Sequence, residues 1–179
     1  DEASYSAKYS LPDTKIWIGA KTMPTSVNVD VPSITNNPNI LSEIFSEIGV
    51  LVMENGQLVD TNTPLADGIH VFSASREIAG IYSEAREYAI EVDTVAPEIT
   101  FVDLPNAVDR DRFLLQIHFS ENVASATIND EEIDLGSCGG NTSYTNAIRL
   151  ESGVNWFSLV VTDYAGNSSY ETFSVERLS

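Results

Sequence analysis

Two stretches of similar pattern constrain the fold of this chain more than any other feature. The clearer copy lies at residues 155–167 and a weaker copy at residues 71–80, and each contains an Ala-Gly pair near its end. Each copy belongs to a segment that begins with a glycine, Gly68 or Gly153, and each precedes another segment of alternating apolar residues. Repetition of this kind predicts two similar β-modules that follow one another along the chain.

The length and composition agree with two folded modules. The chain has 179 residues, of which 42% are hydrophobic and 20% are charged. We place the modules at residues 1–94 and 95–179, and each is then about the size of one immunoglobulin-like sandwich. No apolar run in the sequence approaches the ~18 residues that a membrane span needs. The sequence therefore predicts no membrane span in this segment.

The second half carries short alternating segments with a turn about every ten residues. Its clearest strand is 112–120, where Phe113, Leu115 and Ile117 fall on one face. Seven short strands at this spacing are typical of an immunoglobulin-like β-sandwich. The predicted strands are 98–103, 112–120, 124–130, 132–135, 147–150, 154–162 and 168–177, with a loop over 136–145.

The first half repeats this plan with a short helix inserted. Strands are predicted at 15–20 and 26–31, and a hairpin at 49–59 around Asn55-Gly56, a strong turn signal. Apolar residues from Ile40 to Ile48 fall at helical spacing and predict a helix over 39–48. The helix either packs over one end of the sandwich or binds a partner. The fold class is therefore all-β, with two tandem immunoglobulin-like sandwiches.

The net charge of −18 and the single cysteine restrict the class of protein. An acidic surface repels nucleic acid and anionic membranes, so neither is an expected partner. The same carboxylates serve solubility or supply oxygen ligands for divalent cations. Cys138 alone excludes an intramolecular disulfide, so packing or ions must stabilise the fold.

Two motifs resemble the tandem bacterial immunoglobulin-like (Big-type) modules of secreted and surface proteins. Residues 93–97 read Asp-Thr-Val-Ala-Pro, as in the linker that opens a module of that family, and residues 162–167 read Thr-Asp-Tyr-Ala-Gly-Asn, as in its final hairpin turn. The pattern covers residues 93–179 and is weaker over 1–92. The resemblance implies an extracellular or cell-surface location, with neighbouring modules of the same polypeptide and a host or cell-surface protein or glycan as partners.

Alternating strand direction brings several oxygen-bearing side chains to the junction of the modules. The linker, the loop between the second and third strands of the second module and its final turn share one pole, and Asp67 belongs to the facing pole. We predict a Ca²⁺ site there, because this ion takes about six to eight oxygen ligands. Alternatively, Asp163 and Asn167 bond only the backbone of their own turn. The predicted ligands are Glu91, Asp93, Glu121, Asn122, Asp163 and Asn167.

Two tryptophans are candidate contact residues, and catalytic candidates are weak. Trp156 is out of phase with the inward residues of its strand, and Trp17 has the same ambiguity; each either contacts a sugar or protein or is covered by a neighbouring segment. His70, His118 and Cys138 belong to no acid–base or nucleophile motif. The sequence therefore predicts a non-enzymatic spacer or stalk of an exported bacterial surface protein. The alternative is a carbohydrate-binding accessory pair of a larger secreted polysaccharide-processing enzyme.

Overall fold

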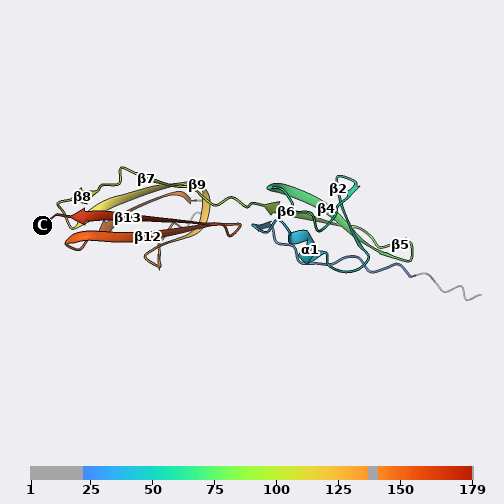
Figure 1. The fold of residues 1–179 in the computed structure, drawn as a ribbon. Helices are drawn as coiled ribbons and strands as arrows, with labels where there is room; N and C mark the ends of the chain where they lie inside the picture. Colours follow the sequence, from blue (N-terminus) through green and yellow to red (C-terminus); the bar gives the residue numbers. More distant parts are fainter. Residues whose placement is uncertain (1–21, 137–140, 179) are drawn as a thin grey trace, which may run out of the picture.

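The computed structural model describes residues 22–136 and 141–178 and is built almost entirely of β-strands (Figure 1). Strands β1 to β6 and helix α1 lie at one end of an elongated molecule, and strands β7 to β13 lie at the other. The prediction of two successive immunoglobulin-like sandwiches with a short helix in the first is confirmed. Among the described residues, no helix has the length and apolar character needed to cross a lipid bilayer.

The second sandwich is organised by one long strand that belongs to both layers. The first half of β9 pairs with β7 and β11, and its second half pairs with β10 and β12. Strand β13 pairs with β12, and short β8 runs parallel to β13. The strands are β7 (Ile99–Val102), β8 (Ala107–Val108), β9 (Arg112–Ile128), β10 (Glu131–Glu132), β11 (Asn141–Arg149), β12 (Gly153–Asp163) and β13 (Ser168–Arg177).

Alternation along these strands builds the core of the second sandwich. Leu115 and Ile117 from one layer face Leu159, Val161 and Val175 from the other, and all five side chains are almost fully buried. Burying an aliphatic side chain of this size contributes about 1.5–3 kcal/mol to stability. The core therefore holds the two layers together and fixes the positions of the loops at each end.

Two boundaries predicted for this half were wrong. Strand β9 continues through residues 121–122, where a loop was predicted, because the chain passes between layers there: the pairing with β11 shifts register across these residues, and pairing resumes at Val123. Strand β11 begins at Asn141, although 136–145 was predicted to be a loop. Its polar residues lie at a sheet edge, where only Tyr144, opposite Ile117, has to be buried.

The first module has a sheet with the same strand order as the larger part of the second. The order β3-β2-β4-β6-β1 matches β10-β9-β12-β13-β8, and β1 and β8 are both short strands parallel to their neighbours. The elements are β1 (Ile34–Thr35), α1 (Ile40–Ile44), β2 (Val50–Glu54), β3 (Gln57–Leu58), β4 (Gly68–Ile78), β5 (Ile81–Tyr82) and β6 (Arg86–Val92).

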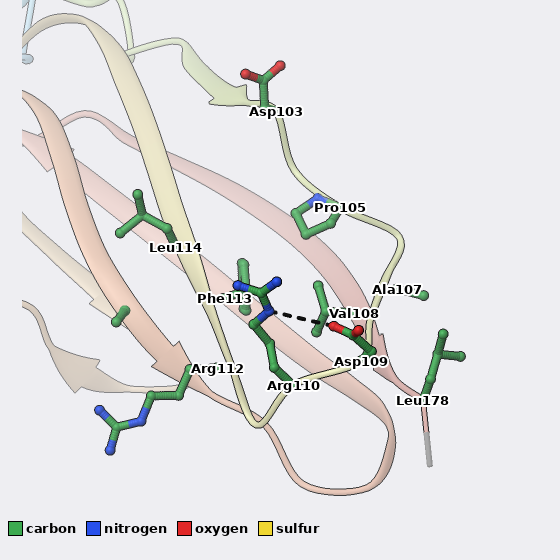
Figure 2. A pocket seen from close by; sticks show the side chains of 11 residues that line it. Asp103, Pro105, Ala107, Val108, Asp109, Arg110, Arg112, Phe113, Leu114 and Leu178 are labelled. Atoms are coloured by element: carbon green, nitrogen blue, oxygen red, sulfur yellow. Dashed lines mark ion pairs between the residues drawn. The ribbon is translucent and has the colours of Figure 1, made fainter.

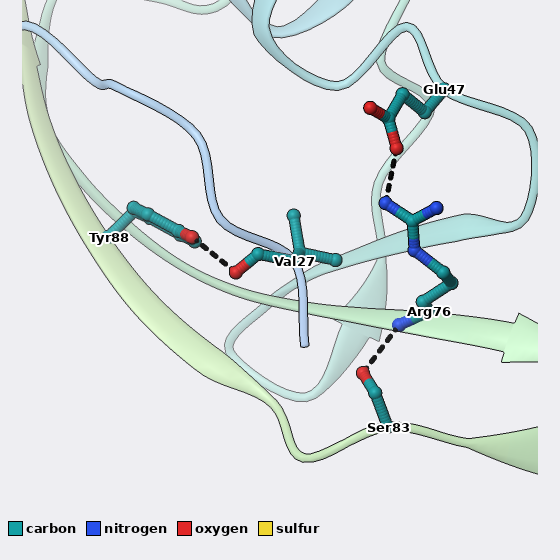
Figure 3. Close-up of polar contacts among 5 residues, drawn as sticks. All are labelled: Val27, Glu47, Arg76, Ser83 and Tyr88. Carbon is teal, nitrogen blue, oxygen red and sulfur yellow. Dashed lines mark hydrogen bonds and ion pairs between the residues drawn. The ribbon is translucent and has the colours of Figure 1, made fainter. Parts of the chain in front are cut away.

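The layer that faces this sheet is irregular in the described residues. The strand predicted at 26–31 was wrong, because this segment has no ladder partner; it still buries Val27 in the core, and the Tyr88 hydroxyl donates to the Val27 carbonyl oxygen at 2.9 Å (Figure 3). Helix α1 packs Ile40 and Leu41 into the same core. The helix ends before the predicted boundary, and Ile48 is 99% exposed. The strand predicted at 15–20 lies outside the described residues.

Polar contacts attach the loop after α1 to strand β4. The Arg76 side chain forms an ion pair with Glu47, and its backbone N–H donates to the Ser83 hydroxyl at 2.9 Å (Figure 3). The Ser83 hydroxyl is buried and donates in turn to the Glu84 carbonyl oxygen at 3.0 Å. These bonds hold the β4–β5 hairpin at the end of the module away from the junction.

The two Ala-Gly pairs of the repeat have different conformations. Ala79 and Gly80 both have positive φ, 51° and 76°, and form the two-residue turn between β4 and β5. In the other copy Gly166 has a φ of 98°, and Ala165 is not among the positive-φ residues. Asn55-Gly56 forms the predicted tight hairpin turn, with φ of 50° and 76°.

Candidate functional site

Three carboxylates from three separate elements meet where the modules join. Asp93 follows β6, Glu121 lies at the bend of β9, and Asp163 ends β12. One carboxylate oxygen of each residue lies within 4.8 Å of those of the other two. The acidic triad has the kind of donor that could hold a metal ion.

Asp163 also stabilises the β12–β13 turn. Its side chain is only 3% exposed, and its Oδ1 accepts hydrogen bonds from the backbone N–H groups of Gly166 at 2.7 Å and Asn167 at 2.8 Å. Its Oδ2 accepts from Asn167 Nδ2 at 2.9 Å. A buried carboxylate is costly unless it is bonded in this way, and the turn sequence provides three N–H donors for Asp163.

Asn167 connects the two modules directly. The same Nδ2 group that donates to Asp163 also donates to the backbone carbonyl of Asp93 at 2.8 Å. On the other side of the turn, a Cβ added to Gly166 would lie 3.5 Å from Asn36 Nδ2, in the loop between β1 and α1. The second module therefore places its β12–β13 turn against the end of the first module, as Figure 1 also shows.

The linker is held by side chains on its first-module side. Asp67 Oδ1 accepts from the backbone N–H of Thr94 at 3.0 Å and from the Thr94 hydroxyl at 2.9 Å. Asp93 Oδ1 accepts from the backbone N–H of Val95 at 3.0 Å, which forms a tight turn of the chain. Pro97, which fixes its own φ, is buried at the start of the second module. These contacts leave the connection few ways to bend.

The electrostatics of the cluster favour a cation. Burial, followed by the nearby Asp93 and Asp163 carboxylates, raises the pKa of Glu121 above its usual range. Among the described residues, none of the three carboxylates forms an ion pair with a Lys, Arg or His side chain. Over residues 22–136 and 141–178, the hydrogen bonds that the Asp93 and Asp163 carboxylates accept all come from N–H groups.

Of the predicted carboxylate ligands, Glu91 alone lies outside the triad. Glu91 is exposed on β6, where it pairs with Ile69 of β4 and Ile34 of β1, and it is outside the group of three carboxylates. Asn122 is exposed beside Glu121 at the bend of β9. The sequence did not predict that Asn36 lies at the junction. Its one signal was that Asn36 and Asn37 stand next to each other between predicted elements.

Trp156 is 70% exposed on the outer face of β12. It pairs with Ser174 of β13, and Val154, two residues earlier on the same face, is 58% exposed. Trp17 and Cys138, also considered from the sequence, lie outside the described residues.

A surface pocket lies beside β8, at the opposite end of the second module from the junction (Figure 2). Its volume is about 740 Å³, and its lining includes Pro105, Leu114 and Leu178 together with the Asp109–Arg110 ion pair at 3.6 Å. Among the described residues, its lining contains no serine, cysteine or histidine, and so no nucleophile of that kind and no histidine base.

No family model and no curated protein matches this chain. Similar solved structures include the fibronectin(III)-like modules of Clostridium thermocellum CbhA, with 12% identity, a TM-score of 0.39 and coverage of 84% of this chain and 82% of that one. Another is SGBP-B of the Bacteroides ovatus mixed-linkage glucan utilization locus, in complex with a mixed-linkage heptasaccharide. It has 18% identity and a TM-score of 0.28, and the match covers 70% of this chain but only 36% of that protein. Neither likeness indicates what this chain binds or does.

Proposed function

We propose that this chain is a non-enzymatic stalk or spacer segment of an exported bacterial surface protein, in which two tandem modules at residues 1–94 and 95–179 hold a fixed relative position. The observation that carries this proposal is the junction. Asn167 donates to the Asp93 carbonyl across it, and three carboxylates converge beside that bond. A short linker tied to the first module by Asp67 favours positioning over free rotation.

The surroundings of the two histidines are compatible with a non-enzymatic role. His70 is engaged through both ring nitrogens in contacts within its own module, and exposed His118 lies in mid-strand on β9. A general base must reach a reacting proton in a pocket, and the cavity at the far end of the second module contains no histidine.

Calcium is the ion that we propose for the junction. The triad offers oxygen donors alone, which suits a hard cation. Burial and then repulsion by Asp93 and Asp163 raise the pKa of Glu121, and the ion would offset that repulsion. Asp93, Glu121 and Asp163 would hold it, and the amide oxygens of Asn122 and Asn167 are the nearest additional side-chain donors in sequence. With the ion bound, the ends of both modules share one ligand, which stiffens the stalk.

The test combines calcium titration with solution scattering on the full chain. We expect calorimetry to detect Ca²⁺ binding by the wild type and little binding by the Asp93→Asn variant. Small-angle scattering in Ca²⁺ should show an elongated particle that becomes more variable in shape after chelation. The matched control is Asp109→Asn, which removes an exposed carboxylate at the other end of the second module and should bind Ca²⁺ like the wild type. Absence of binding, together with identical scattering profiles, would contradict the calcium part of the proposal.

A second function is favoured by one observation, the exposure of Trp156. An exposed tryptophan on a sheet face can stack against a sugar ring, so the chain would serve as a carbohydrate-binding accessory segment of a larger secreted enzyme. A glycan array with the wild type and Trp156→Ala separates the two functions. Binding that the substitution abolishes favours the accessory segment, and no binding by either protein favours the spacer.

A further inference from the structure

His70 faces an acceptor with each of its ring nitrogens. Nδ1 lies 2.9 Å from Glu54 Oε1, and Nε2 lies 2.8 Å from the carbonyl oxygen of Ala66. A neutral imidazole carries one N–H and can donate only one of these bonds. The imidazolium donates both, so this geometry is complete only when His70 is protonated.

In the described part of the chain, the charged group that faces the ring is Glu54. Glu54 faces it from the end of β2, Phe72 of β4 stacks on it at a centroid separation of 5.8 Å, and Ile90 is opposite on β6. From the segment before β4 the ring meets the Ala66 carbonyl. Burial alone would lower the pKa of His70, but the Ala66 carbonyl and the Glu54 carboxylate together raise it above its usual value.

The bond to Ala66 leads directly to the linker. Ala66 precedes Asp67, whose carboxylate accepts from both the backbone N–H and the hydroxyl of Thr94. Thr94 follows Asp93, whose carbonyl accepts the bond from Asn167 of the second module. His70 therefore holds the segment that positions the first-module side of the junction.

The second module has the same arrangement with a side chain that does not titrate. Asn155 Nδ2 donates to the carbonyl of Glu151, four residues earlier, as His70 Nε2 does to Ala66. Both residues follow a strand-initial glycine by two positions, and those glycines pair with the ends of β6 and β13. The bond to a carbonyl four residues earlier is thus common to both modules, whereas the contact with a carboxylate, Glu54, belongs to His70.

We propose that His70 is a pH-dependent latch on the module junction. Protonated His70 holds the 66–67 segment against Glu54 and keeps Asp67 on Thr94; loss of the proton releases one of the two bonds and loosens the linker. This inference rests on the proposed stalk function, since it supplies that junction with a control by pH. The latch is proposed for the protein without a bound metal ion.

The experiment is an NMR titration of the full chain in EDTA from about pH 5.5 to 8.5, across the ordinary range of histidine. The chain has two histidines, so the exposed His118 signal gives an internal comparison for His70. We expect His70 to titrate above about 6.5. The hydrogen-exchange protection of the Thr94 amide, corrected for intrinsic rates, should fall at least about fivefold as His70 loses its proton, which corresponds to one net hydrogen bond.

Two variants separate the latch from a merely structural histidine. His70→Asn copies the second module and should keep Thr94 protected to the same degree at every pH. Glu54→Gln removes the charged partner, so the midpoint of His70 and the change at Thr94 should move together to lower pH. His118→Asn should leave both unchanged. Equal protection of Thr94 on both sides of the His70 titration, or the same pH-dependent change in His70→Asn, overturns the latch. Because calcium is absent, either result leaves the calcium test of the stalk function standing.

Discussion

Glu121 provides the sharpest test of the charge at the junction. Its carboxylate oxygen lies within 4.8 Å of those of Asp93 and Asp163. At that separation each like-charge pair costs about 1 kcal/mol in water-like surroundings. Solvent and salt screen the half-buried cluster, so we expect Glu121→Gln to raise the free energy of unfolding by about 1–2 kcal/mol at neutral pH in EDTA. The apparent melting temperature should rise by about 3–6 °C.

The pH dependence and the response to calcium follow from the same charge. Because the folded-state pKa of Glu121 is raised, the wild type loses stability as pH rises from the unfolded value of about 4.3 through the folded value. Glu121→Gln should lack this loss, so the two proteins converge in acid. Calcium at about 100 times its Kd stabilises a binding-competent protein by about 2.7 kcal/mol, so calcium should reverse the order of stability.

Denaturant unfolding of the full chain, with EDTA or Ca²⁺, measures these differences. The matched control is Glu131→Gln, which removes an exposed carboxylate of β10 in the same module and should change stability by less than about 0.5 kcal/mol. If Glu121→Gln in EDTA is no more stable than the wild type or Glu131→Gln, the carboxylates at the junction do not repel one another and the reasoning is refuted.

Three further substitutions test other parts of the structure by thermal or denaturant unfolding. Gly49→Ala should lower the free energy of unfolding by more than about 2 kcal/mol, because the new Cβ would lie 2.7 Å from the Glu77 carbonyl oxygen and the residue has a φ of 82°. Its control is Gly56→Ala, which has a φ of 76° but no atom within 4 Å of the new Cβ and should cost only about 1 kcal/mol. Asp163→Ala should cost about 2–4 kcal/mol through three lost hydrogen bonds, and unchanged stability would contradict its role in the turn. His70 stabilises the fold at pH values below its unfolded pKa, and this contribution to stability should disappear as pH rises through its raised folded pKa. The same loss of stability over the same pH range in His70→Asn would contradict this role.

Local patterns of the sequence predicted most of the strands and turns. Alternation of apolar residues identified β9, β12 and β13, because a strand with one buried face must repeat every two residues. The Asn55-Gly56 hairpin was predictable because few residues adopt positive φ easily. The same patterns failed at 26–31 and at the start of β11, since hydrogen-bond pairing there depends on partners far away in the chain.

The sequence predicted that the three carboxylates lie at the same end of the second module, but not which of the predicted ligands would come together. Strand direction brought Asp93, Glu121 and Asp163 to one end of the second module, and the structure groups these three oxygen donors. It leaves Glu91 outside that group, because a side chain on a twisted strand end can point away from a site that its neighbour reaches. Calcium binding itself stays a prediction.

By itself, the sequence determined that this chain forms two successive β-modules with tight glycine turns, because residue alternation and backbone conformation are local properties. Tertiary structure alone decided that Asn167 bonds Asp93 and that His70 holds the segment next to the linker. The first contact joins residues 74 positions apart, and the second depends on Glu54 of β2, which faces the other ring nitrogen of His70. Their geometry exists only after the cores have formed and set the ends of both modules in place.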